Sequence, residues 1–146
     1  MDQTIPQIYA EKVRTQRTRS FAFDIPEKEC RAEIIFTLLG IELKIGSKRF
    51  ACPELSTARY LRIFARIGCQ KIAVPYDITK ISLLADELEM AWQTFNLLLE
   101  KDAADSSPRS VARRRSLAIK KIRREIEEIG AGDLMPVFDR ETRQRR

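Results

Sequence analysis

Histidine is absent from this chain, and its five glycines are not clustered. Without histidine the sequence lacks the commonest general base at neutral pH, and it contains no Ser-His or Cys-His nucleophile pair. No G-x-x-x-x-G-K-[ST], G-x-G-x-x-G or G-x-S-x-G motif occurs, so the usual phosphate-binding loops and the nucleophile elbow are missing. We therefore expect a protein that is not an enzyme and that needs no cofactor.

Cysteine and long apolar runs are also scarce. The three cysteines, Cys30, Cys52 and Cys69, are widely spaced and form no C-x-x-C pair, so the common structural zinc sites are excluded. An odd number of separated thiols is typical of buried, reduced cysteines. The N-terminus has no signal-type apolar stretch, and the longest apolar run, near residues 34–41, is too short to cross a bilayer. We expect a cytoplasmic protein with no metal site and no membrane partner.

Charge, in contrast, is plentiful and unevenly distributed. The 146 residues include 27 Lys or Arg and 21 Asp or Glu, for a formal net charge of +6. Residues 103–146 hold 12 basic and 7 acidic side chains, whereas residues 1–102 hold 15 and 14, so the last third carries most of the excess. We expect one globular domain over residues 27–130, with an irregular basic lead-in at 1–26 and a basic tail at 131–146.

Apolar periodicity predicts an α+β fold that is predominantly α. In the stretch "GIELKIGSKRFACP", Ile41, Leu43 and Ile45 alternate with charged residues, which is the period of a half-buried strand. Gly46-Ser47 suits a type II′ turn, so the chain is expected to return as a second strand through Cys52. The stretch "QKIAVP" predicts a short strand that joins this hairpin in a small antiparallel sheet.

Four helices are predicted from apolar stripes, from Pro, Asp and Ser start signals and from Gly stop signals, over residues 27–39, 53–67, 77–101 and 108–129. The last two are expected to form a C-terminal αα-hairpin. Trp92 and Phe95 lie on the apolar stripe of the third helix, and we interpret them as core rather than as a ligand pocket.

The strongest basic cluster lies in the fourth helix, where residues Arg109 to Arg124 include eight Lys or Arg and no Asp or Glu. At 100° per residue these cations are expected to flank the isoleucine stripe on both sides. Like charges this dense weaken a helix unless an anion compensates them. We therefore predict binding of RNA or DNA through phosphate contacts, without strong sequence readout, by Arg113, Arg114, Arg115, Lys120, Lys121 and Arg124.

Other basic segments support this prediction. The second helix carries a row of arginines, Arg59, Arg62 and Arg66, at spacings of three and four. The stretch "RTQRTRSFAF" combines arginines with aromatic rings that can stack on bases, and "RQRR" ends the chain. No KH, RRM or helix-turn-helix signature is present, so the prediction depends on charge alone.

Two alternatives stay open. The third helix is acidic between residues 84 and 102, so its carboxylates can neutralise part of the basic set within the same molecule. The helical hairpin can also serve as a protein interaction or assembly subunit, binding an acidic protein partner or a second copy of the chain as a homo-oligomer.

Overall fold

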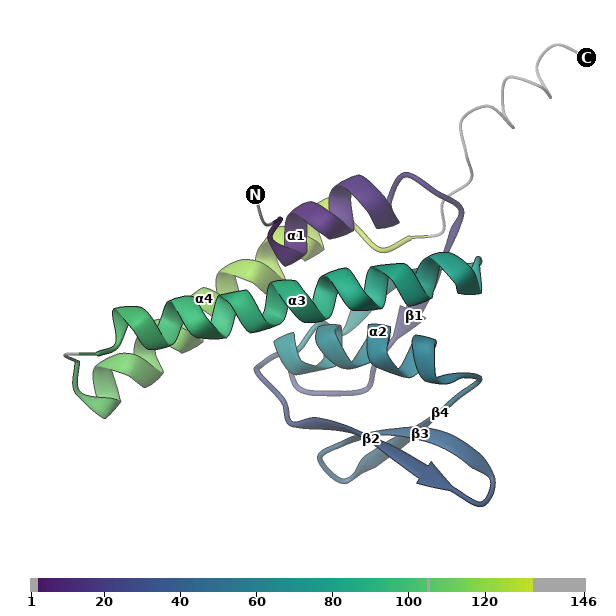
Figure 1. The fold of residues 1–146 in the computed structure, drawn as a ribbon, viewed down its shortest axis with the longest axis horizontal. Coiled ribbons are helices and arrows are strands. Elements are labelled where there is room, and N and C mark those ends of the chain that lie inside the picture. The colour runs from purple at the N-terminus through teal and green to yellow at the C-terminus, as the bar shows by residue number, and fades with distance from the viewer. Residues whose placement is uncertain (1–2, 105, 133–146) are drawn as a thin grey trace, which may run out of the picture.

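Helices and two small antiparallel sheets surround one core in the computed structural model, which describes residues 3–104 and 106–132. This is the α+β, mainly helical class predicted from the sequence. Figure 1 shows α2 between a three-stranded sheet on one side and α3 on the other, with α1 on the far side of α3 and α4 running behind α3, where it contacts both α1 and α2. The elements in chain order are α1 (Ile5–Ile8), the π-helical turn η1 (Tyr9–Val13), β1 (Thr18–Ala22), β2 (Ala32–Thr37), β3 (Gly40–Ile45), β4 (Lys48–Cys52), α2 (Leu55–Ile67), β5 (Lys71–Pro75), α3 (Ile78–Asp102) and α4 (Pro108–Ile129).

The predicted β3–β4 hairpin is confirmed. The two strands pair antiparallel, with Ile41 opposite Cys52 and Ile45 opposite Lys48. Gly46 has a φ of 61°, as the first position of a type II′ turn requires. Leu43 and Ile45 are buried against the core, which confirms the alternation that predicted the strand.

The helix predicted at residues 27–39 is wrong, because this segment forms a loop followed by β2. Strand β2 pairs with β3 along its whole length, from Ala32 opposite Ile45 to Thr37 opposite Gly40. Its β-branched and aromatic residues favour a strand once a partner is available. The connection is Leu38-Leu39, which contains none of the usual turn residues and so carries no hairpin signal.

Strand β5 was predicted correctly in place but not in its partner. It pairs antiparallel with β1, with Thr18 opposite Pro75 and Ala22 opposite Lys71, and not with the β3–β4 hairpin. The molecule therefore has a two-stranded sheet β1-β5 and a separate three-stranded sheet β2-β3-β4.

The lead-in expected to be irregular at residues 1–26 forms α1, η1 and β1 in its described part, and several of its side chains are buried in the core. Helix α1 starts with a capping box at Thr4, and Ile5, Ile8 and Tyr9 are buried. The Tyr9 hydroxyl donates to the carbonyl of Gly130 at 2.7 Å and accepts from the backbone N–H of Ala73 at 3.0 Å. These contacts fasten the start of the chain to β5 and to the end of α4. Of the predicted tail, residues 133–146 lie outside the described residues.

The two C-terminal helices begin and end close to the predicted residues. Asp77 caps α3 by accepting from the Thr79 backbone N–H at 3.0 Å, and Ser107 caps α4 by accepting from the Ser110 backbone N–H at 3.2 Å. None of the described residues between Trp92 and Ile119 is buried. The joined ends of the αα-hairpin therefore extend beyond the core, as Figure 1 shows.

Candidate nucleic-acid interface

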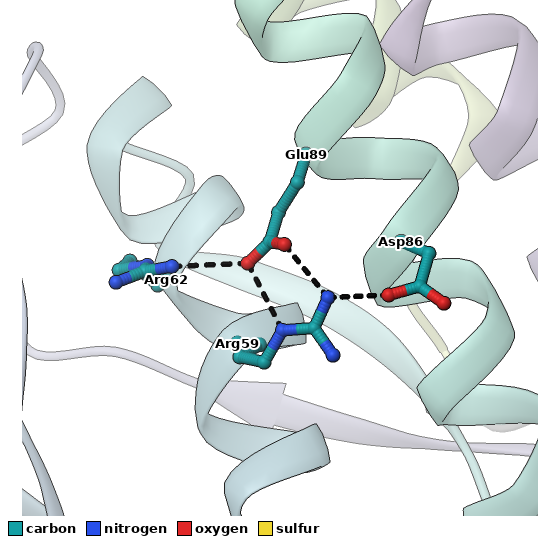
Figure 2. Close-up of polar contacts among 4 residues, drawn as sticks. All are labelled: Arg59, Arg62, Asp86 and Glu89. Carbon is teal, nitrogen blue, oxygen red and sulfur yellow. Dashed lines mark hydrogen bonds and ion pairs between the residues drawn. The ribbon is translucent and has the colours of Figure 1, made fainter.

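The arginine row of α2 is occupied by carboxylates of α3 (Figure 2). Arg59 donates from Nε and Nη2 to the two carboxylate oxygens of Glu89, at 3.1 Å and 2.7 Å, and from Nη2 to Asp86 Oδ1 at 2.5 Å. Arg62 donates from Nη2 to Glu89 Oε2 at 2.9 Å. Two arginines three residues apart thus meet two carboxylates three residues apart on the facing helix.

Partial burial makes this network a structural one. The side chains of Arg59, Arg62 and Glu89 are each only 24% exposed. The hydrogen bonds from Arg59, and then those from Arg62, hold the pKa of Glu89 below its usual value, while the bonds to Glu89 and Asp86 raise the pKa of Arg59. The charges of Arg59 and Arg62 are therefore compensated within the fold, and the supporting role predicted for them in phosphate binding stays a prediction.

Arg66, the third member of the row, has a different environment. It forms no ion pair or side-chain hydrogen bond with the residues that the structure describes, although it is partly buried. Burial is the main cause that lowers the pKa of its guanidinium, and Arg62 adds to the effect. Arg66 and Trp92 line the same cavity.

Two cations of α4 point toward the core. Arg115 donates from Nε and Nη2 to Glu29 at 2.9 Å and 2.7 Å and from Nη1 to Asn96 Oδ1 at 2.7 Å, with its guanidinium 5.7 Å from the centroid of the Trp92 ring. Arg123 is 8% exposed and donates to the carbonyl of Ile67 at 2.9 Å. These two arginines anchor α4 to the rest of the fold, so Arg115, which was predicted to contact nucleic acid, has a structural role.

The remaining six cations of α4 are exposed and together form a surface that we call the α4 basic face: Arg109, Arg113, Arg114, Lys120, Lys121 and Arg124. In the described part of the chain, none of them forms an ion pair with a carboxylate. Arg114 alone is hydrogen-bonded, to the carbonyl of Asp102 at 3.3 Å and to the Ser106 hydroxyl. At 1.5 Å per residue the face is about 22 Å long.

The arrangement of these cations differs from the predicted one. Ile119 and Ile126 are buried against the core, and the basic side chains lie on the opposite, solvent side of α4 with Leu117 among them. They therefore form one continuous surface instead of two flanks of the isoleucine stripe. Arg109 was not among the predicted contacts, although its spacing of four before Arg113 places it on the same face.

The acidic helix α3 does not neutralise this face. Glu87 forms an ion pair with Lys12 of η1, and Asp86 and Glu89 pair with α2. Within the described ranges, neither Glu100 nor Asp102 forms an ion pair through its carboxylate. The intramolecular alternative therefore applies to α2 and η1 and not to the outer side of α4.

The aromatic residues of the lead-in pack against the core, with Phe23 buried and Phe21 half-buried, so the stacking on bases that was predicted for them stays a prediction. Phe23 is buried and packs edge-on against Phe21 with ring centroids 4.9 Å apart. The guanidinium of Arg17 lies 4.8 Å from the centroid of the Tyr76 ring. The predicted contacts of the C-terminal "RQRR" lie outside the described residues.

No group of three or more His, Cys, Asp or Glu in residues 3–104 and 106–132 is arranged to hold a metal ion. Over the same residues, no helix is both long and apolar enough to span a membrane. The chain matches no protein-family model, no curated protein sequence and no solved structure. Its function is therefore inferred from the residues of α4 and their surroundings.

Proposed function

We propose that this chain is a non-enzymatic protein that binds RNA or DNA through phosphate contacts of the α4 basic face. One observation carries the proposal: six exposed cations share one side of a helix, and no carboxylate among the described residues pairs with them. Their mutual repulsion weakens the helix, and a row of phosphate groups compensates it. Release of the counterions condensed on the nucleic acid then drives association.

The chemistry of the face favours backbone contacts over base recognition. It contains no Asn or Gln, the side chains that pair with the edge of adenine. Lys120 and Lys121 carry compact charges that bind phosphate without fixed geometry. An exposed helix of ordinary diameter can lie along a phosphate backbone or enter a major groove about 12 Å wide. Affinity is therefore expected to depend on salt much more than on sequence.

The first test measures fluorescence anisotropy of labelled mixed-sequence oligonucleotides, as single-stranded RNA and as duplex DNA, over a range of salt concentrations. If about five of the six cations of the α4 basic face contact phosphates of a duplex, a plot of the logarithm of the association constant against the logarithm of the salt concentration should have a slope of about −4.5. Binding that barely changes between low and physiological salt contradicts the proposal.

A matched pair of variants separates the α4 basic face from overall charge. Arg113→Glu/Arg124→Glu reverses two cations of the face, whereas Lys71→Glu/Lys80→Glu reverses two exposed cations on β5 and α3. Both variants change the net charge by the same amount. The first is expected to weaken binding roughly a hundredfold and the second less than about threefold. Equal losses from the two variants would show that net charge alone determines binding.

A second candidate function is assembly with another copy of the chain. Leu97, Leu98 and Leu117 are more than half exposed near the protruding end of the αα-hairpin. The carboxylates of Glu100 and Asp102 at the end of α3 are complementary in charge to the first cations of α4. In a two-fold dimer, the carboxylates of one copy can therefore form ion pairs with the cations of the other copy. Sedimentation velocity is expected to show a dimer that is lost in Leu97→Glu/Leu98→Glu. A monomer at the highest attainable concentration contradicts this candidate.

A further inference from the structure

A cavity of about 510 Å³ lies between the start of β2, the last turn of α2 and the middle of α3. It is lined by Trp92 of α3, Arg66 of α2 and the segment from Glu29 to Glu33. This volume falls in the range of sites that hold small molecules.

The cation in this cavity has no counterion. Arg66 forms no ion pair or hydrogen bond through its side chain with the described residues, and burial disfavours its charged form and lowers its pKa. One turn earlier, the buried Nε of Arg62 also has no hydrogen-bond partner in this part of the chain. A partly buried guanidinium without a partner costs free energy, and a bound anion removes that cost.

The acidic groups at the cavity do not supply this anion. Both carboxylate oxygens of Glu29 are bonded to Arg115. Burial raises the pKa of the Cys30 thiol, which donates to the carbonyl of Lys28 at 3.2 Å and is neutral at pH 7. Glu33 also lines the cavity, but it is exposed and lies opposite Lys44 of β3. Glu89 favours the charged form of Arg66 electrostatically, yet no carboxylate of the described chain forms an ion pair with Arg66.

We propose that this cavity binds the phosphate of a small phosphate monoester, with Arg66 and Arg31 on the phosphate oxygens and the rest of the ligand against Trp92 and Ala32. A guanidinium presents paired donors that match phosphate geometry. The cavity lies on the core side of α4, where Arg115 packs, and not on the α4 basic face, so the proposal does not depend on nucleic-acid binding. The phosphate can belong to a free metabolite or to the 5′ end of a strand.

Trp92 is the single tryptophan of the chain, so its fluorescence reports directly on this cavity. We would titrate the protein with AMP, glycerol 3-phosphate, inorganic phosphate and adenosine, and with a short oligonucleotide with and without a 5′-phosphate. Saturable changes in emission are expected with phosphate esters and not with adenosine. A response to both free esters identifies a metabolite-type ligand, whereas a response to the phosphorylated oligonucleotide alone identifies a strand end.

Substitutions at Arg66 complete the test. Arg66→Gln is expected to weaken phosphate-ester binding at least about tenfold, since a hydrogen bond to a charged group is lost. Arg66→Lys keeps the charge without the paired donors and is expected to bind with intermediate affinity, which decides the question if Arg66→Gln fails to fold by circular dichroism. Lys80→Gln, an exposed position of α3 outside both sites, serves as the charge-matched control and is expected to leave the fluorescence titrations unchanged.

Three results would overturn the proposal. They are the absence of saturable binding by every phosphate-bearing probe, equal binding of adenosine and AMP, and unchanged affinity in Arg66→Gln. Loss of oligonucleotide binding in Lys120→Gln with normal AMP binding would bear only on the α4 basic face, so the two sites succeed or fail separately.

Discussion

The arginine row of α2 and the basic face of α4 look alike in the sequence and have opposite surroundings in the fold. On α2, Arg59 and Arg62 meet Asp86 and Glu89 of the packed helix α3. On α4, the outer cations meet no carboxylate among the described residues. Basic residues at helical spacing therefore predict a positively charged helix face. Whether that face can bind an external anion depends on the acidic residues of the neighbouring helix, which can form ion pairs with it.

The two regions also differ in what supports them. Helix α2 is buried along most of its length, and its arginines contribute to the interface with α3. Helix α4 is held through Ile119, Arg123 and Ile126 in its second half, while its first half has no buried residue. Like-charge pairs on such a helix cost a few tenths of a kcal/mol each. The α4 basic face is thus maintained at some expense of stability, which is typical of a functional surface.

The largest effect is expected from removing both paired cations of α2. Arg59→Gln/Arg62→Gln leaves the 24% exposed carboxylate of Glu89 without its partners. We expect the free energy of unfolding in urea to fall by about 3 kcal/mol, because a poorly solvated charge loses its hydrogen bonds. The oligonucleotide affinity of the folded protein should stay the same. Reduced affinity with unchanged stability would mean that the α2 row binds nucleic acid after all.

The converse pair, Arg113→Gln/Arg124→Gln, is expected to change affinity and not stability. Exposed side chains without partners usually alter the free energy of unfolding by less than about 0.5 kcal/mol. Oligonucleotide affinity should fall roughly tenfold, and the salt slope should decrease by about 2 because two phosphate contacts are lost. If this pair destabilises the fold as strongly as the α2 pair, the two regions do not differ as described.

Neighbouring residues sharpen the comparison within α4 itself. Arg115 is bonded to Glu29 and Asn96, whereas Arg113, two positions earlier, lies on the α4 basic face. Arg115→Gln is expected to cost about 1 kcal/mol of unfolding free energy and leave oligonucleotide affinity unchanged. Arg113→Gln should do the reverse. The same outcome for both single variants would show that orientation on the helix has no influence on binding.

Local sequence patterns were sufficient for most elements. The β3–β4 hairpin and the helices α2, α3 and α4 follow from alternation, capping residues and the glycine at position 68, which ends α2 with a φ of 88°. Strand β2 was missed because the Leu38-Leu39 connection gives no turn signal and its apolar residues also fit a short helix. The pairing of β1 with β5 joins segments about fifty residues apart, which no local pattern specifies.

The candidate site was predictable only in part. The charge of α4 could be read from the sequence, but the inward position of Arg115 depends on Glu29, a residue 86 positions away. A signal for the α2 network did exist. The arginines of α2 and the carboxylates of α3 both have a spacing of three. The two helices run in the same direction, so Arg59 meets Asp86 and Glu89 while Arg62 meets Glu89.

The smallest expected effect is a pH dependence of stability, which the α2–α3 network should show and the α4 basic face should not. The pKa of Glu89 is held below the ordinary value of 4.5 by its bonds to Arg59 and then Arg62. A carboxyl group whose pKa is lower in the folded than in the unfolded chain stabilises the fold. This contribution is fully present at pH values above the unfolded pKa, and it is lost as the pH falls through the folded pKa.

Urea unfolding at a series of pH values measures this contribution. The difference in unfolding free energy between the wild type and Glu89→Gln is expected to be constant near neutral pH and to shrink as pH falls below about 4.5. Arg113→Gln should follow the wild type at every pH, because Arg113 forms no ion pair with a carboxylate of the described chain. A Glu89→Gln profile parallel to the wild type down to acid pH would show that the α2–α3 carboxylate is not stabilised in the fold. The contrast between a paired and an unpaired row of cations would then lose its energetic basis.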